Sequence, residues 1–316
     1  MAVRGTHGST GGIVFASIAL YLVWGITYIA NRVAVAELPS FALAAVRFLV
    51  AGGVLFAWLR WRGVPGLTGA EWRVAVIVGF LLCLGNAFVA WAVHIVPLGI
   101  AAVLVAMTPG FLVLFDWLRP DGRRPGMRVV VGLVLGVIGI AVLMSARQNG
   151  ARAFNPLGAV LILFGTIAWS GGSIYSRQAA RPESPFMQTA SQMLAGGAAL
   201  LPIALILGQF RGVSPGQLSA AWWQAFAFLV IFGSIVGFSA YVYLLSHSSP
   251  ATAGSYAFVN PVIAAISGWI LFNEHLAPRA FAAFAIILFA VALIVSASQV
   301  ARKPATPPVV DEPACA

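Results

Sequence analysis

Long apolar segments recur along the whole chain, and they constrain its fold more than any other feature. A helix needs about 20 apolar residues to cross the hydrocarbon core of a bilayer. Ten segments of about this length can be drawn, at residues 12–33, 40–59, 74–94, 98–118, 127–145, 157–175, 186–207, 222–245, 251–272 and 280–297. Only 8% of the 316 residues are charged, compared with roughly 25% in soluble domains. We therefore predict an all-α integral membrane protein with ten transmembrane helices.

The two halves of the chain repeat each other. Residues 24–32 (WGITYIANR) align with 169–177 (WSGGSIYSR), residues 49–53 with 193–197, and residues 100–109 with 252–261. Because each half holds an odd number of helices, five, the second copy must enter the membrane in the opposite direction. The prediction is two inverted five-helix repeats, at residues 12–146 and 155–298. The remaining residues, 299–316, are expected to form a disordered cytoplasmic tail.

Basic residues set the predicted orientation. If the N-terminus is cytoplasmic, 12 of the 18 Lys and Arg residues fall in cytoplasmic gaps and tails, five fall outside, and Arg47 is left within the membrane. Basic residues are enriched on the cytoplasmic side of membrane proteins. We therefore expect both termini in the cytoplasm, and we attribute the net charge of +10 to topology and not to nucleic-acid binding.

Two prolines occupy corresponding places in the halves, in the dipeptides Thr108-Pro109 and Asn260-Pro261. A proline inside a helix leaves the carbonyl four residues earlier without its usual donor. Paired interruptions of this kind near the midplane point to the binding site of a transporter. We predict helix breaks at Pro109 and Pro261 beside a central cavity, with packing kinks that serve no ligand as the alternative.

Polar and aromatic side chains at helical spacing indicate which helices share this cavity. Tyr256 and Asn260, for example, lie one turn apart just before Pro261. The predicted substrate-binding residues are Trp24, Tyr28, Asn86, Trp169, Tyr241, Tyr256 and Asn260. For any single aromatic residue in this set, the alternative is core packing or a place in the interfacial belt.

Two further ionisable residues lie in predicted membrane segments. Arg47 is well inside the second helix, where a charge costs at least about 2.5–3.5 kcal/mol on insertion scales, so it must face protein or water. It could bind a ligand carboxylate or anchor the carbonyls of a broken helix; its aligned counterpart is Ser191. His94, near the outer end of the third helix, is a candidate proton sensor, with an ordinary interfacial histidine as the alternative.

Missing residue types exclude several functions. All eight acidic residues lie in gaps, tails or helix ends, which disfavours exchange of cations for protons. A single intramembrane Arg disfavours phosphorylated substrates. The sequence has no HExxH or Walker motif, and its two cysteines, Cys83 and Cys315, cannot form a metal site or disulfide framework. We therefore expect no enzymatic activity, no cofactor and no metal, and a small neutral or zwitterionic solute.

These motifs resemble the EamA-type branch of the drug/metabolite transporter superfamily. The similar segments are residues 22–28 (LVWGITY), Pro39 with Arg47-Phe48, 99–109, 158–169, 249–261 and 271–274 (LFNE). The resemblance covers about residues 12–298. It implies a ten-helix fold of inverted repeats around a central cavity, and export of metabolites that include amino acids, aromatic ones among them. The chain departs from the family pattern after the fourth helix, where Asp121-Gly122 replaces the expected acidic residue in an Arg-rich loop.

The resulting hypothesis is a secondary transporter of the bacterial cytoplasmic (inner) membrane. It would export amino acids or similar small metabolites by alternating access of the two repeats around a midplane site. Its expected partners are the solute and the lipid bilayer, with no nucleic acid, and we expect a monomer. The alternatives are an exporter of lipophilic cationic drugs and a passive solute channel, which linear rather than saturable flux would reveal.

Overall fold

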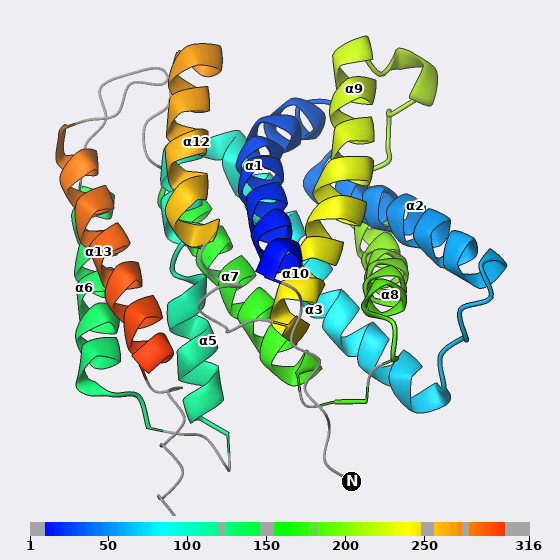
Figure 1. The fold of residues 1–316 in the computed structure, drawn as a ribbon. Helices are drawn as coiled ribbons and strands as arrows, with labels where there is room; N and C mark the ends of the chain where they lie inside the picture. Colours follow the sequence, from blue (N-terminus) through cyan, green and yellow to red (C-terminus); the bar gives the residue numbers. More distant parts are fainter. Residues whose placement is uncertain are drawn as a thin grey trace, which may run out of the picture.

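The computed structural model describes residues 10–119, 124–145, 155–177, 179–180, 182–247, 256–273 and 278–300. Within these residues the chain is helical and contains no strand (Figure 1). The helices are α1 (Thr10–Val35), α2 (Ser40–Trp61), α3 (Gly69–Ile95), α4 (Leu98–Val105), α5 (Thr108–Trp117), α6 (Met127–Ser145), α7 (Pro156–Ser176), α8 (Pro185–Ile206), the 3-10 helix η1 (Pro215–Gln217), α9 (Ala220–Phe228), the π-helix η2 (Leu229–Val236), α10 (Gly237–His247), α12 (Tyr256–Phe272) and α13 (Pro278–Val300).

Seven helical segments are long and apolar enough to cross a membrane: Thr10–Val35, Ser40–Trp61, Gly69–Ile95, Leu98–Trp117, Pro156–Ser176, Pro185–Ile206 and Ala220–His247. Three shorter apolar helical segments are Met127–Gly139, Val259–Phe272 and Phe281–Ala290. The predicted all-helical membrane architecture is confirmed. That all ten segments cross the membrane stays a prediction.

Polar residues mark where several helices begin. Thr68 and Glu71 form a reciprocal capping box at the start of α3. The side chains of Asn155, Ser184 and Ser219 accept backbone N–H bonds at the starts of α7, α8 and α9. These caps satisfy N–H groups that have no partner within the helix, so each apolar run begins at a defined residue.

Helix pairing follows a regular pattern. α2 packs along α8, α3 along α7 and α8, α4 along α12, and α6 along α13, while α1 contacts α12 and the continuous segment α9–η2–α10. Figure 1 shows α6 and α13 side by side at one edge, α2 toward the opposite edge, and α1, α7 and α10 between them. Residues from both halves of the sequence therefore meet in the middle of the molecule.

Glycines allow α2 and α8 to approach closely. A Cβ added at Gly52 would lie 2.5 Å from the backbone N of Leu194, and a Cβ added at Gly197 would lie 2.7 Å from the backbone N of Leu49. The two contacts are equivalent under one shift of 145 residues, from 52 to 197 and from 49 to 194. The same shift relates the aligned segments that begin at residues 24 and 169.

This reciprocity corrects the predicted alignment of the second helix of each half by one residue. The alignment of residues 49–53 with 193–197 is wrong, because the packing matches Gly52 with Gly197. The counterpart of Arg47 is consequently Gln192 and not Ser191. Both halves carry several small residues in succession here, so sequence similarity alone does not fix the register.

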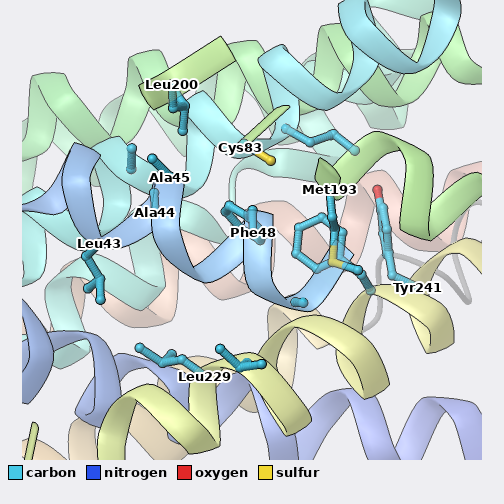
Figure 2. Close-up of a cluster of buried hydrophobic side chains, with 14 of the residues drawn as sticks. Leu43, Ala44, Ala45, Phe48, Cys83, Met193, Leu200, Leu229 and Tyr241 are labelled. Carbon is cyan, nitrogen blue, oxygen red and sulfur yellow. The ribbon is translucent and has the colours of Figure 1, made fainter. Parts of the chain in front are cut away.

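Buried apolar side chains form two clusters. One cluster includes Phe48 on α2, Met193 on α8 and Tyr241 on α10 (Figure 2). The other includes Ile100 on α4 and Ile162 on α7. Each cluster draws on both halves of the chain, so neither half forms its core alone.

The C-terminal helix extends further than expected. α13 continues to Val300, two residues into the segment predicted as tail. The rest of that segment, residues 301–316, lies outside the described residues, as does its predicted disorder.

Candidate substrate-binding site

A cavity lies where α1, α3, α7 and α12 meet. Its volume, counted as the space open to the centres of water molecules, is about 80 Å³, whereas one water needs roughly 10–15 Å³ on this measure. Its lining residues are Trp24, Thr27, Tyr28, Asn31, Arg47, Gly85, Asn86, Val89, Val105, Thr108, Gly165, Thr166, Trp169, Phe238, Tyr256 and Asn260. The cavity can hold several waters or a small organic solute.

Six of the seven predicted substrate-binding residues line this cavity: Trp24, Tyr28, Asn86, Trp169, Tyr256 and Asn260. The seventh, Tyr241, lines a second, smaller pocket. Its hydroxyl accepts a hydrogen bond of 3.2 Å from Trp169 Nε1. The structure thus brings all seven into one neighbourhood, and their role in binding a solute stays a prediction.

Aromatic rings surround Trp24 on the inner side of α1. Its ring centroid lies 5.5 Å from that of Trp169, 5.3 Å from Tyr241, 5.0 Å from Tyr256 and 6.0 Å from Phe238. The Trp169, Tyr256 and Phe238 rings meet Trp24 edge to face, a preferred arrangement of aromatic pairs. Rings from α7, α10 and α12 therefore form a continuous aromatic wall with α1.

Arg47 brings a positive charge to the cavity. Its side chain is 3% exposed, and its Nε donates a 2.8 Å hydrogen bond to Ser234 Oγ in the π-helix η2. Its guanidinium carbon lies 4.9 Å from the centre of the Phe48 ring. Among the described residues, no acceptor bonds its two terminal nitrogens and no carboxylate pairs with it. These N–H groups are available to a ligand.

Arg32, and not Arg47, anchors helix carbonyls. Its Nε donates to the carbonyl oxygen of Val93 at 2.8 Å and its Nη2 to that of Val96 at 2.6 Å. Both carbonyls lie at the C-terminal end of α3, where cations are stabilising. The anchoring role considered for Arg47 therefore belongs to Arg32, in the last turn of α1.

The two proline segments have different structures. α4 ends at Val105 and α5 begins at Thr108, with Pro109 in its first turn. Thr108 Oγ1 donates a 2.5 Å hydrogen bond to the Val105 carbonyl, so this freed carbonyl is already occupied. The predicted break at Pro261 is wrong, because α12 runs without interruption from Tyr256 to Phe272. A proline removes one backbone bond but does not always end a membrane helix.

Asn260 presents an unused acceptor. Its side chain is 3% exposed and lines the cavity, and its Oδ1 has no hydrogen-bond partner among the described residues. Leaving a buried polar atom unpaired costs about 1–3 kcal/mol. An N–H or O–H donor inside the cavity would remove this cost.

Several lining residues were not predicted. Thr27, Thr166 and Phe238 belong to helices already implicated, but their residue types occur throughout apolar helices and give no signal of their own. Asn31 also lines the cavity, and it is not among the predicted substrate-binding residues. His94, the candidate proton sensor, lies in the last turn of α3, is exposed, and is not part of the cavity lining.

The described lining residues include one charged side chain, Arg47, and no Asp, Glu or Lys. Its other polar groups are hydroxyls, amides and indoles. Such a cavity offers one positive site, hydrogen-bonding groups and aromatic faces. It suits a small solute that carries a negative group and an apolar or hydrogen-bonding body.

Several known proteins with similar sequences are named as transporters. The profile of the EamA-like transporter family matches the chain twice, at residues 10–145 and 156–296. The uncharacterized inner membrane transporter YedA of Escherichia coli (strain K12) is 39% identical over 301 residues, which cover 94% of this chain and 95% of its own. The uncharacterized transporter YvbV of Bacillus subtilis (strain 168) is 23% identical, covering 90% of this chain and 92% of its own.

Protein PecM of Dickeya dadantii (strain 3937) is also 23% identical, covering 89% of this chain and 91% of its own. A solved crystal structure with 20% sequence identity matches 93% of this chain and 100% of its own chain, with a TM-score of 0.63. That likeness concerns the fold alone. The family matches span both halves of the sequence. The chain therefore belongs to the EamA-like transporter family of the drug/metabolite transporter superfamily and is a multi-pass membrane transporter.

Proposed function

We propose that this transporter exports amino acids or similar small zwitterionic metabolites across the bacterial inner membrane. The observation that carries the proposal is that one aromatic cavity contains both unpaired guanidinium N–H groups on Arg47 and an unpaired acceptor on Asn260. A carboxylate would pair with the guanidinium, and an ammonium group would donate to Asn260 Oδ1. Aromatic faces would contact the rest of the solute.

The charge of the cavity disfavours the two other solute classes. A lipophilic cation would be repelled by Arg47 and would find no carboxylate among the described lining residues. A phosphorylated metabolite would need several converging cations, whereas the described lining residues provide one, Arg47. A zwitterion needs one cation and one acceptor.

Helix pairing and internal contacts support an inverted-repeat architecture with ten crossings. The family profile matches each half of the chain separately. If the ten apolar segments are numbered within each half, the contacts α2 with α8, α4 with α12 and α6 with α13 join equivalent helices. The contact of α3 with α7 likewise corresponds to that of α1 with α9–η2–α10. A two-fold axis between inverted halves produces this pattern, and such halves support alternating access.

Counterflow in liposomes tests the proposal. Purified protein is reconstituted, the liposomes are loaded with one unlabelled amino acid at a time, and entry of the same labelled amino acid is measured. We expect saturable entry that is stimulated by the internal solute, and a loss of at least about tenfold in apparent affinity for Arg47→Gln. Arg62→Gln, which removes a charge from the exposed end of α2, is the control and should behave as wild type.

The rival functions give different results in the same assay. Linear entry without stimulation would establish a channel. Stimulated entry of lipophilic cations, with none for any amino acid, would establish a drug exporter. Either result would overturn the proposal.

A further inference from the structure

A second pocket lies beside the central cavity, and Tyr241 is the one predicted substrate-binding residue that lines it. It is formed by the C-terminal part of α7 with Arg177, the N-terminal half of α8, α10 and Leu82 on α3, and we call it the polar chamber. Ser176 Oγ accepts hydrogen bonds there from Gln188 Nε2 at 2.8 Å and from Gln192 Nε2 at 3.4 Å. Its volume is about 10 Å³, room for no more than about one water. In this conformation the polar chamber is contracted.

Tyr241 forms the partition between the two spaces. It is 1% exposed and lines the polar chamber, while Trp169 lines the central cavity. Its hydroxyl lies 3.2 Å from Trp169 Nε1 and 3.2 Å from Ser173 Oγ. Its ring centroid lies 5.3 Å from those of Trp24 and Trp169. Two hydrogen bonds and three ring contacts, the third with Tyr256 at 6.2 Å, therefore hold this side chain between chamber and cavity.

The polar chamber has an expanded counterpart in the other half. The shift of 145 residues that relates Gly52 to Gly197 also relates Arg47 to Gln192 and Asn31 to Ser176. Gln192 and Ser176 line the contracted chamber, whereas Arg47 and Asn31 line the central cavity. Equivalent positions of the two halves thus line a wide space toward one end of the molecule and a narrow space toward the other.

Such asymmetry between inverted repeats is what one state of an alternating-access cycle requires. When the halves exchange conformations, the surfaces of the polar chamber open and their counterparts close. With the proposed orientation, the chamber faces the cytoplasm, because the α7–α8 connection carries Arg177 and lies on the side predicted to be cytoplasmic.

We propose that Tyr241 is the cytoplasmic gate of the transporter and that the polar chamber is the entry subsite for the solute. The inference rests on the proposed function for the direction of transport, but the gate itself concerns only the two spaces. Amide and hydroxyl groups in the chamber, together with Arg177, which also lines it, would bind the polar end of a zwitterion. The solute would then pass Tyr241 and meet Arg47 and Asn260 in the central cavity.

Cysteine accessibility tests the gate without any solute. Val242→Cys places a reporter in the polar chamber, and Val89→Cys places one in the central cavity. Both are made in a chain with Cys315→Ser, whose remaining cysteine, Cys83, is buried and sets the background. A membrane-impermeant maleimide is added to reconstituted protein from each side in turn, and the labelling rates are measured.

Tyr241→Phe removes the hydroxyl and keeps the ring. We expect labelling of the Val242→Cys reporter from the cytoplasmic side to rise roughly 3- to 10-fold, the change that loss of one or two neutral hydrogen bonds allows. Labelling of the Val89→Cys reporter from the other side should fall. Tyr243→Phe is the matched control: this tyrosine lies on the same helix, stacks on His247 and is not part of either lining, so both rates should stay unchanged.

Other outcomes overturn the gate. Unchanged rates in folded Tyr241→Phe would show that its hydroxyl holds nothing closed, and a rise at both reporters would show general loosening. If Tyr241→Phe does not fold, Ser173→Ala removes one of the two hydrogen bonds and should produce the same opposite changes with smaller size. Failure of amino-acid counterflow with reporters that still respond would reject the solute class and keep the gate.

Discussion

The two proline segments near the centre of the molecule share one sequence pattern but have different structures. In the first half the helix breaks before Thr108, and the Thr108 hydroxyl occupies the Val105 carbonyl. In the second half α12 runs through Pro261, and the Asn260 amide oxygen is buried without a partner beside the cavity. The polar group of the first segment stabilises its own helix, whereas that of the second is left unpaired beside the cavity.

A second pair of positions shows the same divergence. Arg47 directs unpaired N–H groups to the central cavity, whereas its counterpart Gln192 donates to Ser176 in the contracted chamber. Duplication has therefore preserved where the helices lie, while the polar side chains between them have taken different roles. The halves are similar as scaffolds and unequal as binding surfaces.

The largest expected effect concerns the scaffold that the halves share. Gly52→Leu would drive a side chain into the backbone of α8, because even a Cβ would lie 2.5 Å from the Leu194 nitrogen. We expect a cost at or above the upper end of about 1–3 kcal/mol and little folded protein in size-exclusion chromatography. Gly197→Leu should fail equally, since the contact is reciprocal.

Gly53→Leu is the control for the predicted contact of Gly52 with α8. No atom lies within 4 Å of a Cβ at Gly53, so this variant should accumulate as folded protein. If Gly53→Leu failed while Gly52→Leu folded, the correspondence of Gly52 with Gly197 would be wrong.

The next effect separates the two proline segments. Asn260→Ala should weaken solute binding by about 1–3 kcal/mol without lowering thermal stability, because it removes an unpaired polar atom. Thr108→Val should lower stability by about 0.5–1.5 kcal/mol, the net worth of one hydrogen bond. Although Thr108 also lines the cavity, its hydroxyl proton is already donated to Val105, so affinity should fall less than in Asn260→Ala. Both quantities are measured on monodisperse protein in detergent. Equal effects of the two variants on affinity would contradict the distinction.

The smallest effect concerns how equivalent helices begin. α3 starts with a local capping box, whereas Ser219 at the start of α9 donates its backbone N–H and its hydroxyl to the distant carboxylate of Glu37. These two hydrogen bonds lower the pKa of Glu37, and the bond from the Ser219 hydroxyl contributes more than the bond from its backbone N–H. The carboxylate therefore stabilises the fold above the ordinary glutamate pKa of about 4.3, and the stabilisation is lost as the pH falls through the lowered pKa.

Glu37→Gln tests this contact. We expect a small deficit in melting temperature at pH 7 that shrinks as the pH falls below about 4. Glu183→Gln, which changes an exposed carboxylate that makes no hydrogen bond to the described residues, is the control and should melt at the wild-type temperature at pH 7. A deficit of Glu37→Gln that grows at low pH would contradict the assignment.

The positions of the helices could be predicted from the sequence for a physical reason. In lipid the backbone must satisfy its own hydrogen bonds, so a long apolar run has little choice but to be helical. The spacing of Tyr256 and Asn260 also suffices to place both on the cavity side of one helix. These properties are local, and a single sequence expresses them directly.

The remaining features depend on contacts between distant residues. Arg47 bonds Ser234 and Arg32 bonds Val93, and no local pattern specifies either pairing. The sequence likewise contains the proline at position 261 but not the neighbouring helices that keep α12 continuous. The one-residue error in the repeat alignment has the same origin, because close packing of glycines fixes the register and their identities alone do not.

The central claim is that Arg47 in the cavity between the halves binds the carboxylate of a small zwitterion. Its most direct test measures the affinities of wild type and Arg47→Gln for a transported amino acid and for the corresponding amide, which lacks the carboxylate charge. Wild type should bind the acid at least about tenfold more tightly than the amide, as loss of a charge-assisted hydrogen bond requires. Arg47→Gln should bind the two almost equally. Discrimination of the same size in both proteins would contradict the claim, because the carboxylate would then be bound elsewhere.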